Sequence, residues 1–435
     1  MENQCLRLIF RIVLFTFVTL NSISCKKKTE KNIINESSLV IGQVDSIYSN
    51  VLGESREIWI YIPESAKEKS NEAAKYPVLY LLDGPSHFKS LAGMVDQLSL
   101  ASGNMVVPEM IVVGIANTNR TLDLTPSQVD IDFISGDSIP YISGGGNNFL
   151  DFVEEELIPH MEKAYPASGY RTFVGHSFGG LSVINALVTR PELFSNYVAI
   201  DPSLWWDNRG FLNFADSLLT KNRFENKSLF IGVANTLEEG MDIESVQSDT
   251  VPDTYYTIQM KSIMKFVKSL ESKEYNNLLF KWEYYPDDDH GSVPLITEYD
   301  ALRFLFPWYR LDGVNDLYSQ NSTMSTDDIL KMINSHYENI SNKFGYKIIP
   351  SEQFINNMGY GFMNNDMNEK SFALFNLNIQ NYPRSSNVYD SMGDCFLAKQ
   401  DSTQALKYFT KALQVGKNDF SQEKIDMLKS KLKAE

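Results

Sequence analysis

The stretch Tyr170-Arg-Thr-Phe-Val-Gly-His-Ser-Phe-Gly-Gly180 decides the fold. An apolar run leads into Gly-x-Ser-x-Gly with one further glycine, and apolar residues then recur at helical spacing as far as Arg190. This order predicts a strand, a sharp turn and a helix, with the hydroxyl of Ser177 exposed at the turn. The flanking glycines let two backbones approach there without a Cβ clash. Ser177 is therefore the first candidate for a nucleophile.

Strands and helices are predicted to alternate on both sides of this turn. Two segments with alternating polarity, 40–48 and 56–62, predict an antiparallel pair. Further strands are expected at 77–82, 110–114, 197–200, 228–233 and 278–285, and helices at 88–100, 148–165, 255–270 and 294–306. The segment 117–146 is long and irregular, and such loops are usually functional or mobile. The pattern predicts an α/β-hydrolase domain over residues 40–310, with a mainly parallel central sheet.

Beyond residue 310 the sequence shows no strand pattern, and a repeat begins. Gly359 and Gly393 are 34 residues apart (393 minus 359), and Phe375 and Phe409 share that spacing. Residues 311–435 therefore resemble two tetratricopeptide units in a small all-α domain. Because three units are normally needed for a stable array, we expect a helix at 327–343 or the hydrolase domain to support them. A plain helical extension is the alternative.

The N-terminus resembles a bacterial lipoprotein signal. Arg7 and Arg11 accompany an apolar run from Leu8 to Leu20, which is too short for a membrane span and fits a signal peptide. We expect residues 1–24 to be removed, Cys25 to carry the lipid, and residues 25–39 to form a flexible tether. The match is degenerate, because Ser22 stands where leucine is usual. An ordinary cleaved signal or an uncleaved anchor is the alternative.

Composition limits the classes of function. The 435 residues carry a formal net charge of −16, which disfavours a nucleic-acid partner. Of the three cysteines, at positions 5, 25 and 395, only Cys395 would remain as a thiol after processing and acylation. Neither a disulfide nor a cysteine metal site is then expected, and no H-E-x-x-H motif is present. We predict no metal and no cofactor.

A nucleophilic serine needs a base and a carboxylate that orients the base. Only His290 and His336 follow Ser177, and His290 directly follows the last predicted strand, so we predict it as the base. The carboxylate is expected in the loop after the strand at 228–233. The candidates, in order of preference, are Glu238, Asp242 and, from the preceding strand end, Asp201.

An oxyanion hole usually combines two backbone N–H groups. Phe178, which follows the serine, is one candidate donor. The second is expected from the turn at 82–87, where Pro85 stands at the usual position and has no N–H. Either Gly84 or Ser86 is therefore expected to take that role.

Several side chains are candidates for a substrate pocket, and each has a structural alternative. His87 is as well explained by the turn itself. Trp205 and Trp206 could equally be core residues. Arg120 is expected at the pocket rim with Asp123, or else the two residues form a buried ion pair.

Five segments together resemble one family. They are Leu81-Leu-Asp-Gly84, Asn117-Thr-Asn-Arg-Thr-Leu-Asp-Leu-Thr-Pro126, Gly175-His-Ser-Phe-Gly-Gly180, Ser203-Leu-Trp-Trp206 and Asp289-His-Gly-Ser292. They are similar to the putative esterase family, which includes esterase D, feruloyl, acetyl-xylan and siderophore esterases. The resemblance covers residues 40–310 and is greatest to lipoprotein members with C-terminal tetratricopeptide repeats. Pro85 departs from the family pattern.

This resemblance implies a serine carboxylesterase that acts through an acyl-enzyme on a siderophore-type, aryl or carbohydrate ester. A location in the bacterial cell envelope is expected, with a lipid anchor in the outer membrane, facing the periplasm or the surface. The alternative is a catalytically weak or inactive hydrolase that binds a protein partner through its helical repeats. A structural surface protein is disfavoured, because the order of serine and histidine would then have no explanation.

Overall fold

The computed structural model describes residues 39–67, 74–99, 105–221, 223–248, 250–272, 277–319 and 322–434. The chain divides into two units, Met1–Val40 and Ile41–Glu435, and every element below belongs to the second. The predicted signal peptide, residues 1–24, and the predicted lipidation site, Cys25, lie outside the described residues. No helix in the described ranges is long and apolar enough to cross a membrane.

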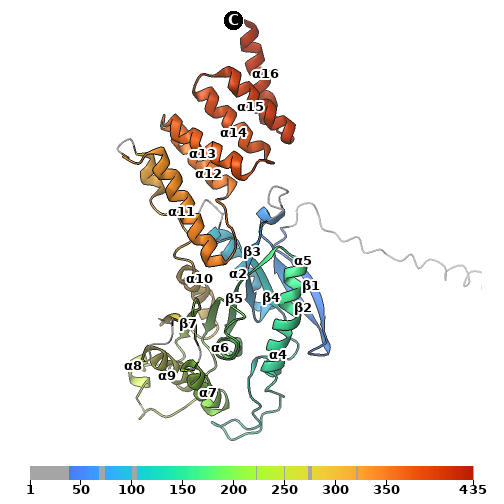
Figure 1. Cartoon of the computed structure of the whole chain (residues 1–435). Helices are drawn as coiled ribbons and strands as arrows, with labels where there is room; N and C mark the ends of the chain where they lie inside the picture. Colours follow the sequence, from blue (N-terminus) through green and yellow to red (C-terminus); the bar gives the residue numbers. More distant parts are fainter. Residues whose placement is uncertain are drawn as a thin grey trace, which may run out of the picture. The chain divides into compact units, whose positions relative to one another are not determined.

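One sheet of eight strands organises the first part of this unit (Figure 1). Its spatial order is β1-β2-β4-β3-β5-β6-β7-β8. The pairs β1–β2 and β2–β4 are antiparallel, and the remaining pairs are parallel. The predicted α/β-hydrolase fold with a mainly parallel sheet is confirmed. The strands are β1 (Gln43–Ser49), β2 (Glu54–Tyr61), β3 (Tyr76–Leu81), β4 (Ile111–Ile115), β5 (Ala167–His176), β6 (Asn196–Ile200), β7 (Ser228–Ala234) and β8 (Leu279–Tyr285).

The sheet is covered on both faces, as the continuous apolar runs predict. All six residues of β3 are buried, and successive side chains enter opposite cores, Val78 and Tyr80 one core and Leu79 and Leu81 the other. Helices α5 (Ile158–Ala164), α6 (Phe178–Thr189), α7 (Gly210–Leu219) and α9 (Ile258–Ser272) pack into the first core. Helices α2 (Gly84–Ser99) and α10 (Val293–Leu305) pack into the second.

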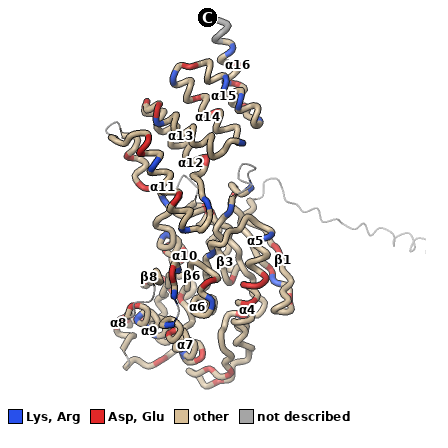
Figure 2. Tube along the Cα trace, viewed as in Figure 1, with Lys and Arg blue, Asp and Glu red and all other residues tan. Residues whose placement is uncertain are grey.

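Several local elements differ from the sequence expectation. The helix expected at 148–165 is α4 (Gly146–Phe152) and α5, joined by one π-helical turn, η4 (Val153–Leu157). The irregular segment 117–146 contains α3 (Arg120–Leu124). Short helices that the pattern did not predict are α8 (Ile243–Val246), η1 (Glu64–Lys67), η5 (Asp207–Arg209) and η6 (Val314–Tyr318). In Figure 2, lysine and arginine lie scattered among acidic residues along the trace.

After β8, α10 and η6, the described part of the chain continues with six α-helices: α11 (Thr326–Phe344), α12 (Glu352–Asn364), α13 (Asn368–Asn381), α14 (Ser386–Ala398), α15 (Ser402–Val415) and α16 (Asp419–Ala434). The first of them share a core with the sheet. Ile333 of α11 and Met358 of α12 belong to the same buried cluster as Leu79 and Val112 of the strands. Tyr346 also donates a hydrogen bond to the main-chain carbonyl of Lys75. The supporting role expected for the helix at 327–343 therefore has a structural basis in this shared core.

The spacing of 34 residues reappears as a packing motif. A Cβ on Gly359 would overlap the ring of Phe375, and a Cβ on Gly393 would overlap the ring of Phe409. In each case a glycine in the first helix of a pair lets an aromatic ring of the second helix press against the backbone. The pairs are α12 with α13 and α14 with α15, which gives the repeated glycine and phenylalanine a shared physical reason.

This packing predicts that Gly393→Ala lowers the free energy of unfolding by about 1–3 kcal/mol, because the added methyl overfills the contact with Phe409. The matched control is Gly93→Ala in the exposed interior of α2, where a Cβ would meet no atom within 4 Å. That change should stabilise the protein by about 0.5–1 kcal/mol through helix propensity. Calorimetric melting of both variants tests this, and a Gly393→Ala variant that melts at or above wild type contradicts the packing.

Glu298 of α10 is a buried acid without a partner. It is 2% exposed, and neither carboxylate oxygen has a hydrogen-bond partner among the described groups. Burial raises the pKa of Glu298 to about 8 from an ordinary value of 4.5. The native protein therefore holds this proton at neutral pH, whereas the unfolded chain releases it.

Between about pH 4.5 and 8 the unfolded state binds fewer protons at this site than the native state. Stability should therefore fall as the pH rises through that window, by about 1.4 kcal/mol per pH unit at most. Glu298→Gln removes the ionisable group, so its melting temperature should decline less between pH 5 and pH 8 than that of wild type. Parallel slopes for the two proteins would contradict this account.

Candidate active site

Ser177 lies in the turn between β5 and α6. Its backbone has φ 61° and ψ −116°, in the left-handed half of φ that non-glycine residues rarely adopt. A Cβ on Gly175 would overlap the backbone of Gly179, and a Cβ on Gly180 would crowd Pro202. Both glycines are therefore needed for the close approach of strand, turn and helix. The structure has the strand, sharp turn and helix that the sequence predicts.

The strand register places Asp201 beside Ser177. In the parallel pair β5–β6, His176 pairs with Ile200, so the next residues, Ser177 and Asp201, leave the sheet at the same edge. The Ser177 N–H donates to the carbonyl of Ile200 at 2.9 Å. Side chains at the carboxyl ends of adjacent parallel strands commonly form the site in open α/β sheets.

His290 bonds to Asp201. Its Nδ1 lies 2.5 Å from Asp201 Oδ2, and the Asp201 side chain is 1% exposed. A short hydrogen bond to a carboxylate that is itself shielded from water holds a ring in one orientation. Since Nδ1 is engaged by the carboxylate, Nε2 is the nitrogen left for proton exchange with another group.

Asp201 is itself held from three directions. The Ala234 N–H donates to its Oδ1 at 3.1 Å, and Gln259 Nε2 donates to its Oδ2 at 3.1 Å and to its main-chain oxygen at 2.7 Å. Its own N–H donates to Gly232 at 2.8 Å. The residue has φ 40°, a strained conformation for a non-glycine residue. Every oxygen of this buried residue therefore has a partner, and the carboxylate is fixed toward His290.

The preference for Glu238 as the orienting carboxylate is corrected by this geometry. Glu238 is exposed in the loop after β7, whereas the carboxylate bonded to His290 is Asp201, the third candidate. Asp242, the second candidate, accepts from the Ser245 N–H at 2.7 Å and caps α8. The loop after β7 contributes Asn235, whose N–H donates to Asp288 and whose side chain donates to Pro286, so it fastens the loop that carries His290.

Two contacts bring the serine and histidine into one cluster. The hydroxyls of Ser177 and Ser203 are 3.2 Å apart, and Ser203 is two residues from Asp201. The ring of His176, the residue before the serine, lies 4.4 Å from the ring of His290 between centroids. Burial lowers the pKa of His176 to about 3, with the neighbouring His290 acting in the same direction. His176 is therefore neutral at physiological pH and cannot compete for the proton.

The turn at 82–87 lies beside the serine turn. Leu82 donates to the carbonyl of Val174 at 2.9 Å, and α2 begins at Gly84. The Ser86 N–H donates to the carbonyl of Asp83 at 2.9 Å, so it is already engaged. Of the two predicted donors, Gly84 is therefore favoured over Ser86. Phe178 begins α6, and the first N–H groups of a helix have no partner within that helix.

The structure separates the candidates for the substrate pocket. Trp205 is half-buried, with its ring 6.1 Å from Phe178 and 6.5 Å from Phe133. Trp206 is 2% exposed and donates from Nε1 to the carbonyl of Ser127 at 3.0 Å, so it is a core residue. The ring of His87 packs edge-on against His176 at 5.8 Å, and burial lowers the pKa of His87.

Arg120 and Asp123 do not pair with each other. Asp123 bonds Arg56 at 2.6 Å, and Arg120 bonds Asp83.

The sequence analysis also did not single out Gln259, Ser203, His176 or Asn117 for roles near the site. Ser203 and His176 lie inside the sequence motifs that resemble the family, and that position is the sequence signal that could have identified them. Gln259 lies in the first turn of the amphipathic helix α9, outside those motifs, and gives no such signal.

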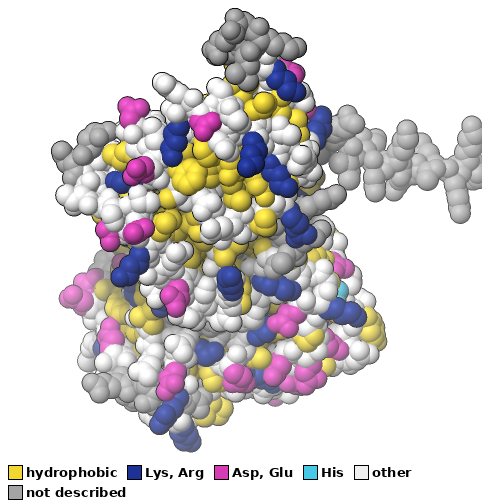
Figure 3. Space-filling model, turned by 45° about the horizontal axis from the view of Figure 1, so that its top comes forward, with side chains coloured by type: hydrophobic (Ala, Val, Ile, Leu, Met, Phe, Trp, Pro, Cys, Tyr) yellow, Lys and Arg dark blue, Asp and Glu magenta, His cyan; other side chains and the backbone are white. Residues whose placement is uncertain are grey.

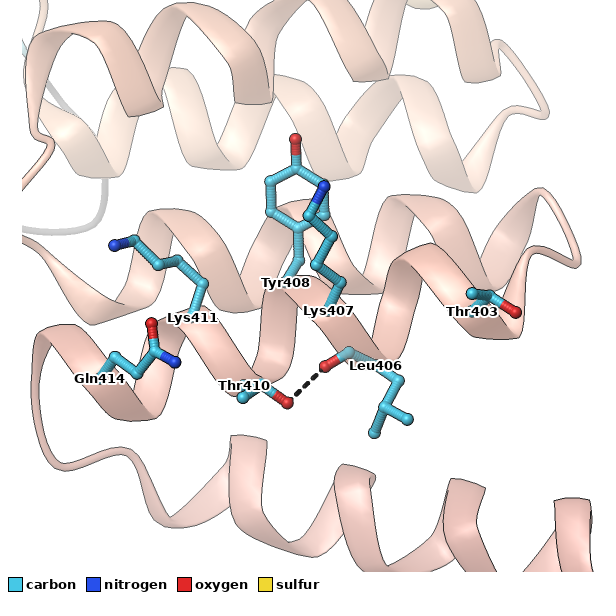
Figure 4. A pocket seen from close by; sticks show the side chains of 7 residues that line it. All are labelled: Thr403, Leu406, Lys407, Tyr408, Thr410, Lys411 and Gln414. Atoms are coloured by element: carbon cyan, nitrogen blue, oxygen red, sulfur yellow. Dashed lines mark hydrogen bonds between the residues drawn. The ribbon is translucent and has the colours of Figure 1, made fainter.

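A cavity of about 660 Å³ lies on α15 and is lined by Thr403, Leu406, Lys407, Tyr408, Thr410, Lys411 and Gln414 (Figure 4). Its lining contains no histidine, cysteine or carboxylate. The view with the helical end turned forward shows hydrophobic side chains exposed between lysine and arginine side chains (Figure 3).

Within the described ranges, no group of three or more His, Cys, Asp or Glu residues could hold a metal ion.

The fold and the Ser177–His290–Asp201 cluster define an α/β-hydrolase with a serine, histidine and aspartate at the carboxyl edge of its sheet. The sequence model of the putative esterase family matches residues 49–267, half of the chain. The chain belongs to this family.

Three relatives illustrate the similarity. The chain is 30% identical over 197 residues to the ferri-bacillibactin esterase BesA of Bacillus subtilis, covering 42% of this chain and 65% of that protein. It is 27% identical over 179 residues to the siderophore triacetylfusarinine C esterase of Aspergillus fumigatus, covering 39% and 59%. It thus spans less than two thirds of these proteins. The structure of an IroE-like serine hydrolase from Shewanella oneidensis is 32% identical with a TM-score of 0.63, covering 78% of this chain and 99% of that one.

The geometry predicts that Asp201→Asn lowers kcat for p-nitrophenyl acetate by about 10²–10⁴-fold, because the amide no longer favours the required orientation and charge of His290. The matched control is Glu238→Gln, which should stay within about twofold of wild type, because Glu238 is exposed and His290 bonds Asp201. Steady-state kinetics of both purified variants check this. A large loss of kcat in Glu238→Gln with little loss in Asp201→Asn would instead favour Glu238 as the carboxylate that orients His290.

Proposed function

We propose that this protein is a serine carboxylic-ester hydrolase that acts through an acyl-enzyme on Ser177. The observation that carries the proposal is the 2.5 Å hydrogen bond between His290 Nδ1 and a buried, fully partnered Asp201, in a cluster with a serine in a strained turn. Acyl transfer by a serine needs a nucleophile, a base that takes its proton, and a group that orients the base. Membership of the putative esterase family supports the same reaction.

In the proposed mechanism, Ser177 Oγ attacks the ester carbonyl carbon while His290 Nε2 takes the hydroxyl proton. The Asp201 carboxylate stabilises the imidazolium that forms. The carbonyl oxygen becomes an oxyanion, for which the N–H groups of Phe178 and Gly84 are the proposed donors. Collapse breaks the bond to the leaving alkoxide, which receives the proton from His290. Water then repeats the sequence on the acyl-serine and releases the acid.

The substrate class is proposed from the relatives and from the aromatic surroundings of the serine. BesA and the Aspergillus fumigatus protein are named as siderophore esterases. Here, Phe178, the residue after Ser177, and Phe133 both lie close to the ring of Trp205. Flat aromatic groups pack well against such a cluster of rings. A siderophore-type or aryl ester is therefore favoured over a carbohydrate ester, and initial rates across the three ester classes decide between them.

Two further predictions rest on sequence alone. Lipid attachment at Cys25, with a location in the cell envelope, is proposed from the signal-like N-terminus. A protein partner on the helical repeats, with or without catalysis, stays a prediction. The repeated contacts of Gly359 with Phe375 and of Gly393 with Phe409 support a tetratricopeptide-like arrangement of α12 to α15.

The proposal predicts that Ser177→Ala abolishes hydrolysis of p-nitrophenyl acetate, with kcat falling by at least about 10³-fold because the nucleophile is lost. The melting temperature should change little, since only one hydroxyl is removed. A fluorophosphonate probe should label wild type and fail to label the variant. Undiminished turnover in Ser177→Ala would overturn the assignment, and an unlabelled, inactive wild type would favour the partner-binding alternative.

A further inference from the structure

Three consecutive residues after the tryptophan pair have a left-handed backbone. Asp207, Asn208 and Arg209 have φ 55°, 47° and 64°, and none of them is glycine. Such conformations cost a non-glycine residue free energy and normally occur at single positions. A run of three persists only where the surrounding structure holds it. This run directly follows Trp205 and Trp206.

The side chains at both ends of the run are bonded to residues that are distant in the sequence. Asp207 accepts a hydrogen bond from Ser127 Oγ at 3.1 Å. Arg209 binds the Asp253 carboxylate with both Nη atoms, at 2.6 and 2.9 Å, and its Nε donates to Ser262 Oγ at 2.9 Å. Bidentate pairs of arginine and carboxylate fix geometry as well as adding energy. The strained run is therefore held from two sides.

The charge balance keeps the pair of Arg209 and Asp253 intact. Hydrogen bonds from Arg209, followed by those from Lys261, hold the pKa of Asp253 at about 2, below its ordinary value of 3.8. Lys261 Nζ lies 3.0 Å from Asp253 Oδ1. Asp253 is thus ionised at neutral pH, and it keeps one cationic partner if Arg209 is replaced. Replacement of Arg209 should therefore loosen the run without leaving an isolated charge.

The run fixes the backbone of the tryptophan pair. The Arg209 N–H donates to the carbonyls of Trp205 and Trp206, at 3.0 and 3.1 Å. Trp206 is locked in the core, with its Nε1 donating to Ser127 and its ring edge-on to Phe178 at 5.1 Å. Trp205 is only half-buried, and its ring lies 6.1 Å from that of Phe178, the residue after the proposed nucleophile. Of the two indoles, Trp205 is the one that a substrate can reach.

We infer that Arg209 and Asp253 are a positioning pair that holds the Trp205 indole near Ser177, where it contacts an aromatic ring of the ester. This inference rests on the proposed ester hydrolysis. Arg209 itself does not touch the substrate in this account, because its guanidinium is engaged by protein groups and it acts through the backbone of Trp205. A side chain that is already held in place loses little freedom when a flat ring packs against it. The pair should therefore set the preference for aromatic over small aliphatic groups.

The test measures two ratios of kcat/KM, because the aromatic ring can belong to the acid or to the alcohol of the ester. The first is p-nitrophenyl benzoate over p-nitrophenyl acetate, and the second is phenyl acetate over ethyl acetate. Trp205→Ala should lower at least one ratio by about 5–20-fold. Arg209→Gln should lower the same ratio by about 2–10-fold, mostly through KM, because the indole is present but less well held. Arg209→Lys keeps the charge without the planar fork and should fall between Arg209→Gln and wild type.

Two comparisons distinguish positioning from a general loss of structure. The matched control is Arg190→Gln: the Arg190 side chain is 19% exposed, against 15% for Arg209, and it also binds carboxylates, those of Asp151 and Glu154. Its ratios should stay within about twofold of wild type. The double variant Trp205→Ala/Arg209→Gln should have the ratio of Trp205→Ala alone, since Arg209 acts through Trp205.

Each outcome decides one part of the account. Unchanged ratios in Trp205→Ala would overturn the aromatic contact. An unchanged ratio in Arg209→Gln, or losses that multiply in the double variant, would overturn the positioning role. If Arg209→Gln does not fold, Asp253→Asn replaces it in the same comparisons.

The positioning pair can also be tested without turnover. Amide hydrogen exchange in peptides spanning 204–210 should be faster in Arg209→Gln than in wild type and unchanged in Arg190→Gln. A wild type without esterase activity would contradict the proposed function, whereas equal exchange in Arg209→Gln and wild type would contradict the clamp on the strained run.

Discussion

The hydrogen bond between His290 and Asp201 is the interaction on which the site depends. It joins the loop after β8 to the end of β6, so His290, the proposed base, reaches Ser177 only if the four strands β5 to β8 keep their register. Parallel pairing supplies that register, since His176 opposite Ile200 puts Ser177 and Asp201 at one edge. The sheet interior is apolar on both faces, which fixes the strands against slippage, because a shift by one residue would move every side chain to the opposite core.

Strained backbone conformations and buried polar groups are concentrated at the carboxyl edge of the sheet. Ser177, Asp83 and Asp201 all have positive φ, and each is held by bonds to its neighbours. Such conformations cost about 1–3 kcal/mol each and persist only where surrounding structure fixes them. The buried imidazole of His176 has a further cost, because its Nε2 has no partner among the described groups. Packing of the two cores offsets these costs, and the proposed nucleophile, base and carboxylate are held in place by contacts within the protein.

Local pattern predicted most of the fold, because each buried strand is a continuous apolar run and the serine turn carries its own glycines. The serine and histidine could be predicted for the same reason. The carboxylate could not be ranked correctly, because Glu238 and Asp201 differ in a property that only packing determines, namely which strand end approaches His290. The roles of Arg120 and Gln259 also depend on contacts between distant segments, with Arg120 bonding Asp83 and Gln259 bonding Asp201. The π-helical turn within the helix at 146–164 likewise has no periodic signal in the sequence.

The central claim is that Ser177 becomes acylated with the help of His290 and Asp201. The most direct measurement is mass spectrometry of the protein quenched in acid during turnover of an activated aryl ester. The account predicts that the acyl group is found on the peptide containing Ser177, and that it forms more slowly in a variant without the His290 imidazole. An acyl group on another residue, or an unmodified protein during demonstrated turnover, would contradict it.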